Sequence, residues 1–211
     1  MTDRGQIIIL NGAPRAGKSS IAKVIQATFP GNWINFGVDA SMAMTPEKLQ
    51  PGIGLRPGGE FPDLEPTVKQ LYRAVFGSIA IHSQLGFNVV SDFGIHEGHS
   101  QPLGVLDDMR SILRGAPLLH VGVMCPLEVI MIRRNPDHEL TDHQGAAGYI
   151  VPPPVRLWQY EVHRNKGYDM TVDTSRGTPE ECAQMIRATL YPDEVPPEAE
   201  PGTEAPPADS Q

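Results

Sequence analysis

The sequence predicts an α/β fold of the doubly wound type, with a parallel five-stranded sheet covered by helices on both faces. Short apolar segments alternate along the chain with segments of helical periodicity, which is typical of strand–helix–strand units joined by right-handed connections. The apolar segments are nearly continuous, and this indicates a sheet that is buried on both sides. The length of 211 residues suits one such domain with an appendage.

The first predicted unit is a helix between two strands. Gln6–Leu10 is a continuous apolar segment and forms the first strand. From Lys18 onward, apolar residues recur three and four positions apart, which predicts a helix that ends at Pro30. Trp33–Val38 is the second predicted strand.

A long loop is predicted to follow. Residues 45–66 contain five Pro and four Gly in 22 positions, too many for regular structure, and we expect this loop on the substrate side. Helical periodicity then returns from about Thr67 to Leu85, with a glycine just beyond it as a stop signal. Phe87–Ser91 is predicted as the third strand and Pro102–Leu113 as the next helix.

The next part of the chain supplies the last two strands. Leu118–Met124 is predicted as the fourth strand, and Pro126–Arg134 begins a helix. Residues 134–155 are polar and then rich in proline, and we predict a lid over this range. Met170–Asp173 is the fifth predicted strand.

The last predicted helix runs to about Leu190 and has a recognisable start. Thr178 can cap the helix, Pro179 suits its first position, and Glu181 completes a capping box.

The acidic charge of the chain is concentrated at its C-terminal end. The formal net charge is −8, and residues 192–211 hold six acids, six prolines and no basic residue. Such a segment cannot bury enough apolar surface to offset its ordering entropy, so we predict a disordered acidic tail. Residues 1–191 form the predicted folded domain and are close to neutral. They lack the clustered basic residues of a nucleic-acid-binding surface, so no nucleic-acid partner is expected.

The sequence predicts a cytoplasmic protein without a membrane partner. Its apolar segments are far shorter than the roughly 20 residues of a membrane-spanning helix. Residues 1–5 lack the basic start and apolar middle of a signal peptide. Cys125 and Cys182 lie in apolar or helical contexts, which fits two reduced thiols better than a disulfide or zinc framework.

A phosphate-binding loop follows the first strand. The pattern G-x-x-x-x-G-K-[ST] is matched by Gly12, Ala13, Pro14, Arg15, Ala16, Gly17, Lys18 and Ser19, and Ser20 follows it. In such a loop the backbone N–H groups surround phosphate oxygens, the lysine reaches the β- and γ-phosphates, and the serine hydroxyl binds Mg²⁺. The helix that starts here adds the positive end of its dipole. The sequence therefore predicts binding of ATP and Mg²⁺, with Lys18 in a catalytic role and Ser19 as the metal ligand.

Two aspartates are predicted at the ends of neighbouring strands. Asp39 comes after the second strand and Asp92 after the third. Because ligands of open α/β sheets bind beyond the carboxyl ends of the strands, both carboxylates are expected to face the phosphate loop. We assign Asp39 the role of catalytic base and Asp92 the binding of substrate or of metal-bound water. An aspartate at such a position can also serve only as a helix cap or turn residue.

Arginines near the predicted lid are candidates for stabilising the transferred phosphoryl group. Arg133 and Arg134 end the helix after the fourth strand, and Arg15 and Arg156 are weaker candidates. Basic residues at a helix C-terminus can also do no more than interact with the helix dipole, so this alternative stays open.

These segments together resemble the chloramphenicol phosphotransferase-like family. The resemblance extends from about Gln6 to Leu190. The segments that carry it are Ile8–Gly12, Ala16–Ser20, Trp33, Phe36–Asp39, Val121–Val123, Cys125, Val162–His163, Gly167–Asp169, Val172–Thr174 and Glu181–Ala183.

The resemblance implies a P-loop kinase fold and ATP-dependent phosphorylation of a small-molecule hydroxyl, which in the namesake enzyme belongs to an antibiotic. It places the family's proposed base on Asp39 and its lid arginine on Arg133. The family's usual R-G-D-R lid element is absent here, and the chain reads Arg133-Arg134-Asn135-Pro136-Asp137-His138 instead. The lid is also longer. The resemblance therefore implies the fold and the donor chemistry more directly than the identity of the acceptor.

Two other functions remain open at this point. A nucleoside or nucleotide kinase calls for several arginines near the acceptor loop, whereas residues 40–66 contain only Arg56. A nucleotide-binding regulatory switch is the second alternative. It is disfavoured because the chain lacks both the N-K-x-D guanine motif and an apolar strand that ends in Asp-Glu.

Overall fold

A computed structural model describes residues 3–134, 151–164 and 167–193 of the chain. The predicted tail 192–211, apart from its first two residues, and most of the predicted lid 134–155 lie outside the described residues. Within the described part of the chain, no helix has the length and apolar character needed to cross a membrane.

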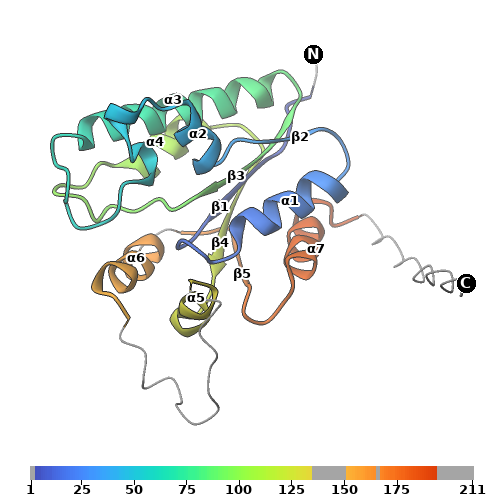
Figure 1. The fold of residues 1–211 in the computed structure, drawn as a ribbon. Coiled ribbons are helices and arrows are strands. Elements are labelled where there is room, and N and C mark those ends of the chain that lie inside the picture. Colours follow the sequence, from blue (N-terminus) through green and yellow to red (C-terminus); the bar gives the residue numbers. More distant parts are fainter. Residues whose placement is uncertain (1–2, 135–150, 165–166, 194–211) are drawn as a thin grey trace, which may run out of the picture.

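The five predicted strands form one parallel sheet in the order β2-β3-β1-β4-β5, which confirms the predicted fold class (Figure 1). The central strand β1 pairs in parallel with β3 on one side and β4 on the other. The strands are β1 (Ile7–Asn11), β2 (Trp33–Asn35), β3 (Asn88–Phe93), β4 (Leu118–Met124) and β5 (Met170–Asp173). All five residues of β1 are buried, as predicted for a sheet covered on both faces.

Helices cover both faces of the sheet. Helices α1 (Lys18–Thr28) and α7 (Pro179–Leu190) lie against one face, and α3 (Glu65–Gln84) and α4 (Val105–Ile112) against the other (Figure 1). Because successive strand residues point to opposite faces, Ile8 belongs to the core under α1 and α7, and Ile9 to the core under α3 and α4.

Three shorter α-helices and two 3₁₀ turns complete the described chain. The α-helices α2 (Val38–Met44), α5 (Leu127–Arg134) and α6 (Pro153–His163) lie near the ends of the strands, and η1 (Glu47–Leu49) and η2 (Gly52–Gly54) are single 3₁₀ turns. The predicted loop 45–66 therefore contains these two turns, and its last residues already belong to α3. Helix α6 was not predicted, because its Pro152–Pro154 segment resembles a break; yet proline is accommodated in the first turn of a helix.

The predicted boundaries were wrong at two strands that bear on function. Strand β2 ends at Asn35, and a helix begins at Val38, so Asp39 lies in the first turn of α2. Strand β3 continues to Phe93, so Asp92 lies within this strand and is buried, not beyond its end. In both cases pairing with neighbouring strands, not the apolar pattern, determines where the strand ends.

Two local predictions are confirmed. Thr178 accepts a hydrogen bond from the backbone N–H of Glu181, and the Glu181 carboxylate accepts one from the backbone N–H of Thr178. Cys125 and Cys182 are buried and form no disulfide.

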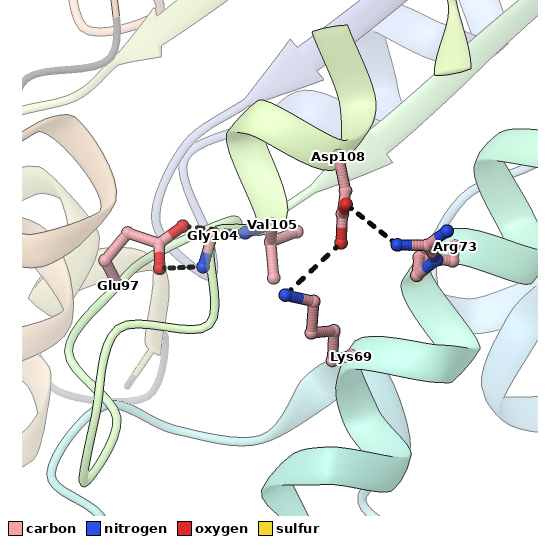
Figure 2. A network of polar contacts seen from close by, with 6 residues as sticks. All are labelled: Lys69, Arg73, Glu97, Gly104, Val105 and Asp108. Carbon is pink, nitrogen blue, oxygen red and sulfur yellow. Dashed lines mark hydrogen bonds and ion pairs between the residues drawn. The ribbon is translucent and has the colours of Figure 1, made fainter. Parts of the chain in front are cut away.

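The loop between β3 and α4 is attached to its surroundings by polar contacts. The Glu97 carboxylate accepts hydrogen bonds from the backbone N–H groups of Gly104 (2.8 Å) and Val105 (3.0 Å) at the start of α4 (Figure 2). One turn further along α4, Asp108 pairs with Lys69 and Arg73 of α3, at 3.7 and 3.1 Å. These contacts hold the β3–α4 loop and α4 in place beside α3.

Candidate active site

The phosphate loop connects the end of β1 to the start of α1. Gly12 lies against β4, since a Cβ built on Gly12 would come within 2.5 Å of the Val123 carbonyl oxygen. Gly17 is the N-cap residue of α1 and has a φ of +93°, in the left-handed region that favours glycine. No side chain among the described residues caps this helix start. The first backbone N–H groups of α1 can therefore bind an anion.

A cavity of about 820 Å³ opens beside this loop. Its volume lies within the range of about 300–1,000 Å³ that is usual for small-molecule sites. The predicted residues that line it are Gly12, Pro14, Arg15, Gly17, Lys18, Ser19, Ser20, Asp39, Asp92 and Arg133. The side chains of Ala13 and Ala16 are buried in the core instead.

Lys18, the first residue of α1, lines this cavity. Its Nζ atom donates a hydrogen bond to the carbonyl oxygen of Ala13 at 2.9 Å. Burial lowers the pKa of this ammonium group to about 8, and the negative charges of Asp92 and Asp39 act in the opposite direction. A bound anion would supply further negative charge and favour the charged lysine.

Ser19 and Asp92 form a hydrogen-bonded pair. The Ser19 hydroxyl donates to Oδ2 of Asp92 at 2.5 Å, and Asp92 is only 8% exposed. A Cβ on Gly37 would overlap Oδ1 of Asp92, so a larger residue at that position would displace the carboxylate. The closeness of Gly37 to the carboxylate therefore constrains where the start of α2 can lie.

A hydroxyl and a carboxylate are oxygen ligands of the kind that Mg²⁺ prefers. Within the described residues there is no group of three or more His, Cys, Asp or Glu side chains that could hold a metal ion. Mg²⁺ commonly binds through one or two protein groups together with substrate phosphates and water.

Asp39 faces the same cavity from the first turn of α2 and is exposed to solvent. Asp39, Asp92 and the phosphate loop therefore line one cavity, as predicted, although Asp39 lies in the first turn of α2 and Asp92 lies within β3.

Arg133 is tied to the phosphate loop and to the end of β5. Its guanidinium group donates to the carbonyl oxygen of Arg15 (3.3 Å) and to the hydroxyl (3.0 Å) and carbonyl oxygen (2.7 Å) of Thr174. The Thr174 hydroxyl in turn donates to the carbonyl oxygen of Ala16 at 2.8 Å. Arg133 and Thr174 therefore hold the phosphate loop from the β5 side.

The other predicted arginines differ in position. Arg134 lines a second, smaller cavity, and Arg156 lies on α6 and lines neither of the two cavities. Neither residue faces the large cavity that contains Lys18 and Asp39.

The sequence interpretation missed Thr174 and an apolar wall. Thr174 follows β5 at the same edge of the sheet as the phosphate loop, and this position could have identified it as a site residue. The apolar wall of the cavity comes from α2, η2 and α6, and its side chains are Val38, Met42, Ile53 and Trp158. These residues are far apart in the chain, and no local pattern brings them together.

Several solved structures, kinases among them, share this fold. The tunicamycin resistance protein of Deinococcus radiodurans aligns with a TM-score of 0.58 and 20% identity, over 89% of this chain and 96% of that one. The APS kinase of Mycobacterium tuberculosis, solved with AMPPNP and APS, aligns with a TM-score of 0.57 and 16% identity, over 90% and 98%. Shikimate kinase from Acinetobacter baumannii, solved with shikimate, has a TM-score of 0.56 and 13% identity, over 92% and 97%. These similarities establish the fold.

No curated protein matches the sequence. The family model described as chloramphenicol phosphotransferase-like protein, however, matches residues 5–191, which is nearly all of the described chain. The chain therefore belongs to the chloramphenicol phosphotransferase-like family and is a small-molecule kinase of the P-loop type.

Proposed function

We propose that this protein transfers the γ-phosphoryl group of ATP to a hydroxyl group of a small molecule. The observation that carries the proposal is the convergence of Lys18, Asp39 and the Ser19–Asp92 pair on one cavity beside the phosphate loop. A cation for phosphate, a free carboxylate and a pair of oxygen ligands are the parts that phosphoryl transfer to an alcohol requires.

In the proposed reaction, the acceptor oxygen attacks the γ-phosphorus from the side of Asp39. A new bond forms between the acceptor oxygen and the γ-phosphorus, and the bond from that phosphorus to the β–γ bridging oxygen breaks. ADP leaves with the electron pair of the broken bond. The carboxylate of Asp39 takes the proton of the acceptor hydroxyl.

The cations of the chain stabilise the charge on the transferred group. Lys18 binds the β- and γ-phosphates, and Arg133 adds positive charge on the β5 side of the loop. Ser19 and Asp92 would hold Mg²⁺, Asp92 through bound water. When bound, the metal neutralises negative charge on the phosphate oxygens.

In this proposal, two parts of the cavity bind two different substrates, ATP and the acceptor. We call the phosphate loop, Arg133 and Thr174 the donor side, and the apolar wall of Val38, Met42, Ile53 and Trp158 the acceptor side. This wall suits an acceptor with an apolar body, such as an antibiotic or a similar natural product. The family description and the tunicamycin resistance protein among the similar structures support this class.

An acceptor screen tests the proposal. The purified chain is incubated with ATP, Mg²⁺ and a panel of hydroxyl-bearing natural products and antibiotics. ADP release is followed, and phosphorylated products are identified by mass spectrometry. We expect at least one alcohol to stimulate ADP release and to gain a phosphoryl group, and Lys18→Ala to abolish both signals. If no alcohol is phosphorylated, the proposed reaction is wrong.

A further inference from the structure

A second cavity of about 280 Å³ adjoins the active site. Pro14 and Trp158 line both cavities, so the two spaces share a wall. The volume is just below the range of about 300–1,000 Å³ that whole ligands occupy. The cavity is therefore suited to one part of a ligand and not to a complete second substrate.

Two arginines from distant parts of the chain meet at this second cavity. Arg56 comes from the segment after η2, and Arg134 from the last turn of α5. Both side chains are exposed, and neither forms a hydrogen bond or ion pair with any residue in the described part of the chain. Among the described residues that line the cavity, none is acidic.

The other lining residues are apolar. Ile130, Val155 and Trp158 line the cavity together with the two arginines and with Pro14 of the phosphate loop. Two positive charges that line one cavity attract an anion, and a bound anion lowers the repulsion between them. A guanidinium group binds a carboxylate through paired hydrogen bonds, and apolar walls strengthen such contacts by excluding water.

We propose that the second cavity binds a carboxylate carried by the acceptor, with Arg56 and Arg134 as its partners. The inference rests on the proposed function and narrows its substrate class: an alcohol with an apolar body and an acidic group. The hydroxyl lies at Asp39, the body lies along Trp158, and the acid enters the second cavity. Arg56 and Arg134 are then specificity determinants of the acceptor.

Binding measurements test this without requiring turnover. A panel of small alcohols that carry a carboxylate, among them 4-(hydroxymethyl)benzoic acid, is compared by calorimetry with the matching primary amides. For at least one member we expect the acid to bind about tenfold or more tightly than its amide, because a charged hydrogen bond replaces a neutral one. If no acid is preferred over its amide, the inference is wrong.

Variants test whether the preference for the acid over its amide arises at the second cavity. We expect Arg56→Gln to reduce the ratio of acid to amide affinity about tenfold, which corresponds to about 1.4 kcal/mol. The matched control is Lys48→Gln, which removes an exposed positive charge from the same segment but lines neither cavity, and it is expected to leave the ratio unchanged. An unchanged ratio in Arg56→Gln contradicts the inference, as does an equal fall in both variants.

The titrations are repeated with AMPPNP and Mg²⁺ to exclude the phosphate loop as the carboxylate site. Acid binding that persists supports the second cavity, whereas acid binding that disappears places the carboxylate at Lys18 and overturns the inference. The outcome is separate from that of the acceptor screen. Phosphorylation of acids and amides with equal efficiency rejects only this inference, and acid-selective binding without any phosphorylation rejects only the proposed reaction.

Discussion

The donor and acceptor sides of the large cavity differ in how their polar groups are held. On the donor side, Lys18, Ser19 and Arg133 all donate hydrogen bonds to the loop or to its neighbours. On the acceptor side, the wall is apolar, and the nearby Arg56 has no partner within the described chain. Preorganised polar groups suit a ligand part that is always the same, namely the phosphates of ATP. Apolar surface with isolated charges suits a part that varies between related enzymes.

The largest expected effect is on the donor side. Lys18→Ala removes the cation that faces the phosphates, and we expect turnover to fall by about 10³-fold or more. The measurement is ATP-dependent phosphorylation of the acceptor found in the screen. The melting temperature serves as the control for folding. Turnover within tenfold of the unaltered chain would show that the donor side is not organised around this lysine.

The next largest effect is expected from Asp39→Asn, which distinguishes phosphoryl transfer to the acceptor from ATP binding on the donor side. Asp39→Asn keeps the shape of the side chain but removes the proton acceptor, and we expect kcat to fall by about 10²-fold or more. The dissociation constant for ATP, measured by calorimetry, should change little, because Asp39 makes no hydrogen bond to the phosphate loop in the described structure. Near-normal turnover in this variant would contradict the assignment of Asp39 as the base.

A smaller effect is expected on the pH dependence of ATP affinity, which again tests the donor side. The Lys18 pKa of about 8 means that the free enzyme loses this positive charge as the pH rises through 8. Bound nucleotide favours the charged lysine and raises its pKa, so ATP affinity should be constant below pH 8. Above pH 8 it should fall by up to about tenfold per pH unit.

The control for this pH dependence is Lys18→Arg. Arginine stays charged to a pKa above about 12, so its ATP affinity, whatever its absolute value, should not change between pH 7 and 9.5. The same decline in both proteins would assign the titration to another group.

The sequence allowed the donor side to be predicted more completely than the acceptor side, for a physical reason. Phosphate binding depends on a turn, a lysine and a helix start that are adjacent in the chain, so residues 12–20 form a local pattern. The two aspartates were predicted to face this loop, and they do. Their elements were misassigned, because the end of a strand depends on pairing with its neighbours.

The acceptor side depends on contacts between distant segments. Trp158 belongs to a helix whose start contains three consecutive prolines, and Arg56 lies in a segment that was predicted only as a loop. Their proximity to Pro14 arises from the way α6 and the segment after η2 pack beside the phosphate loop. Nothing in the local composition of these segments specifies that packing.

One further contact links the acceptor wall to the rest of the fold. The β3–α4 loop reaches the segment after η2 through His96, whose Nε2 atom lies 2.8 Å from the carbonyl oxygen of Leu55. The same loop is held by Glu97 at the start of α4 (Figure 2). Release of Glu97 should therefore loosen the acceptor wall and leave the phosphate loop in place.

The smallest expected effect follows from this attachment. Glu97→Ala leaves the N–H groups of Gly104 and Val105 without their carboxylate, at a cost of about 1–2 kcal/mol. The melting temperature should fall by about 2–8 °C, as measured by calorimetry. The KM for the acceptor should rise severalfold, while ATP affinity stays unchanged. Asp108→Asn is the matched control, because it weakens only the pairs with the exposed Lys69 and Arg73 of α3 and should affect neither constant. If Glu97→Ala weakens ATP binding as much as acceptor binding, the two sides are mechanically coupled and the contrast between them does not hold.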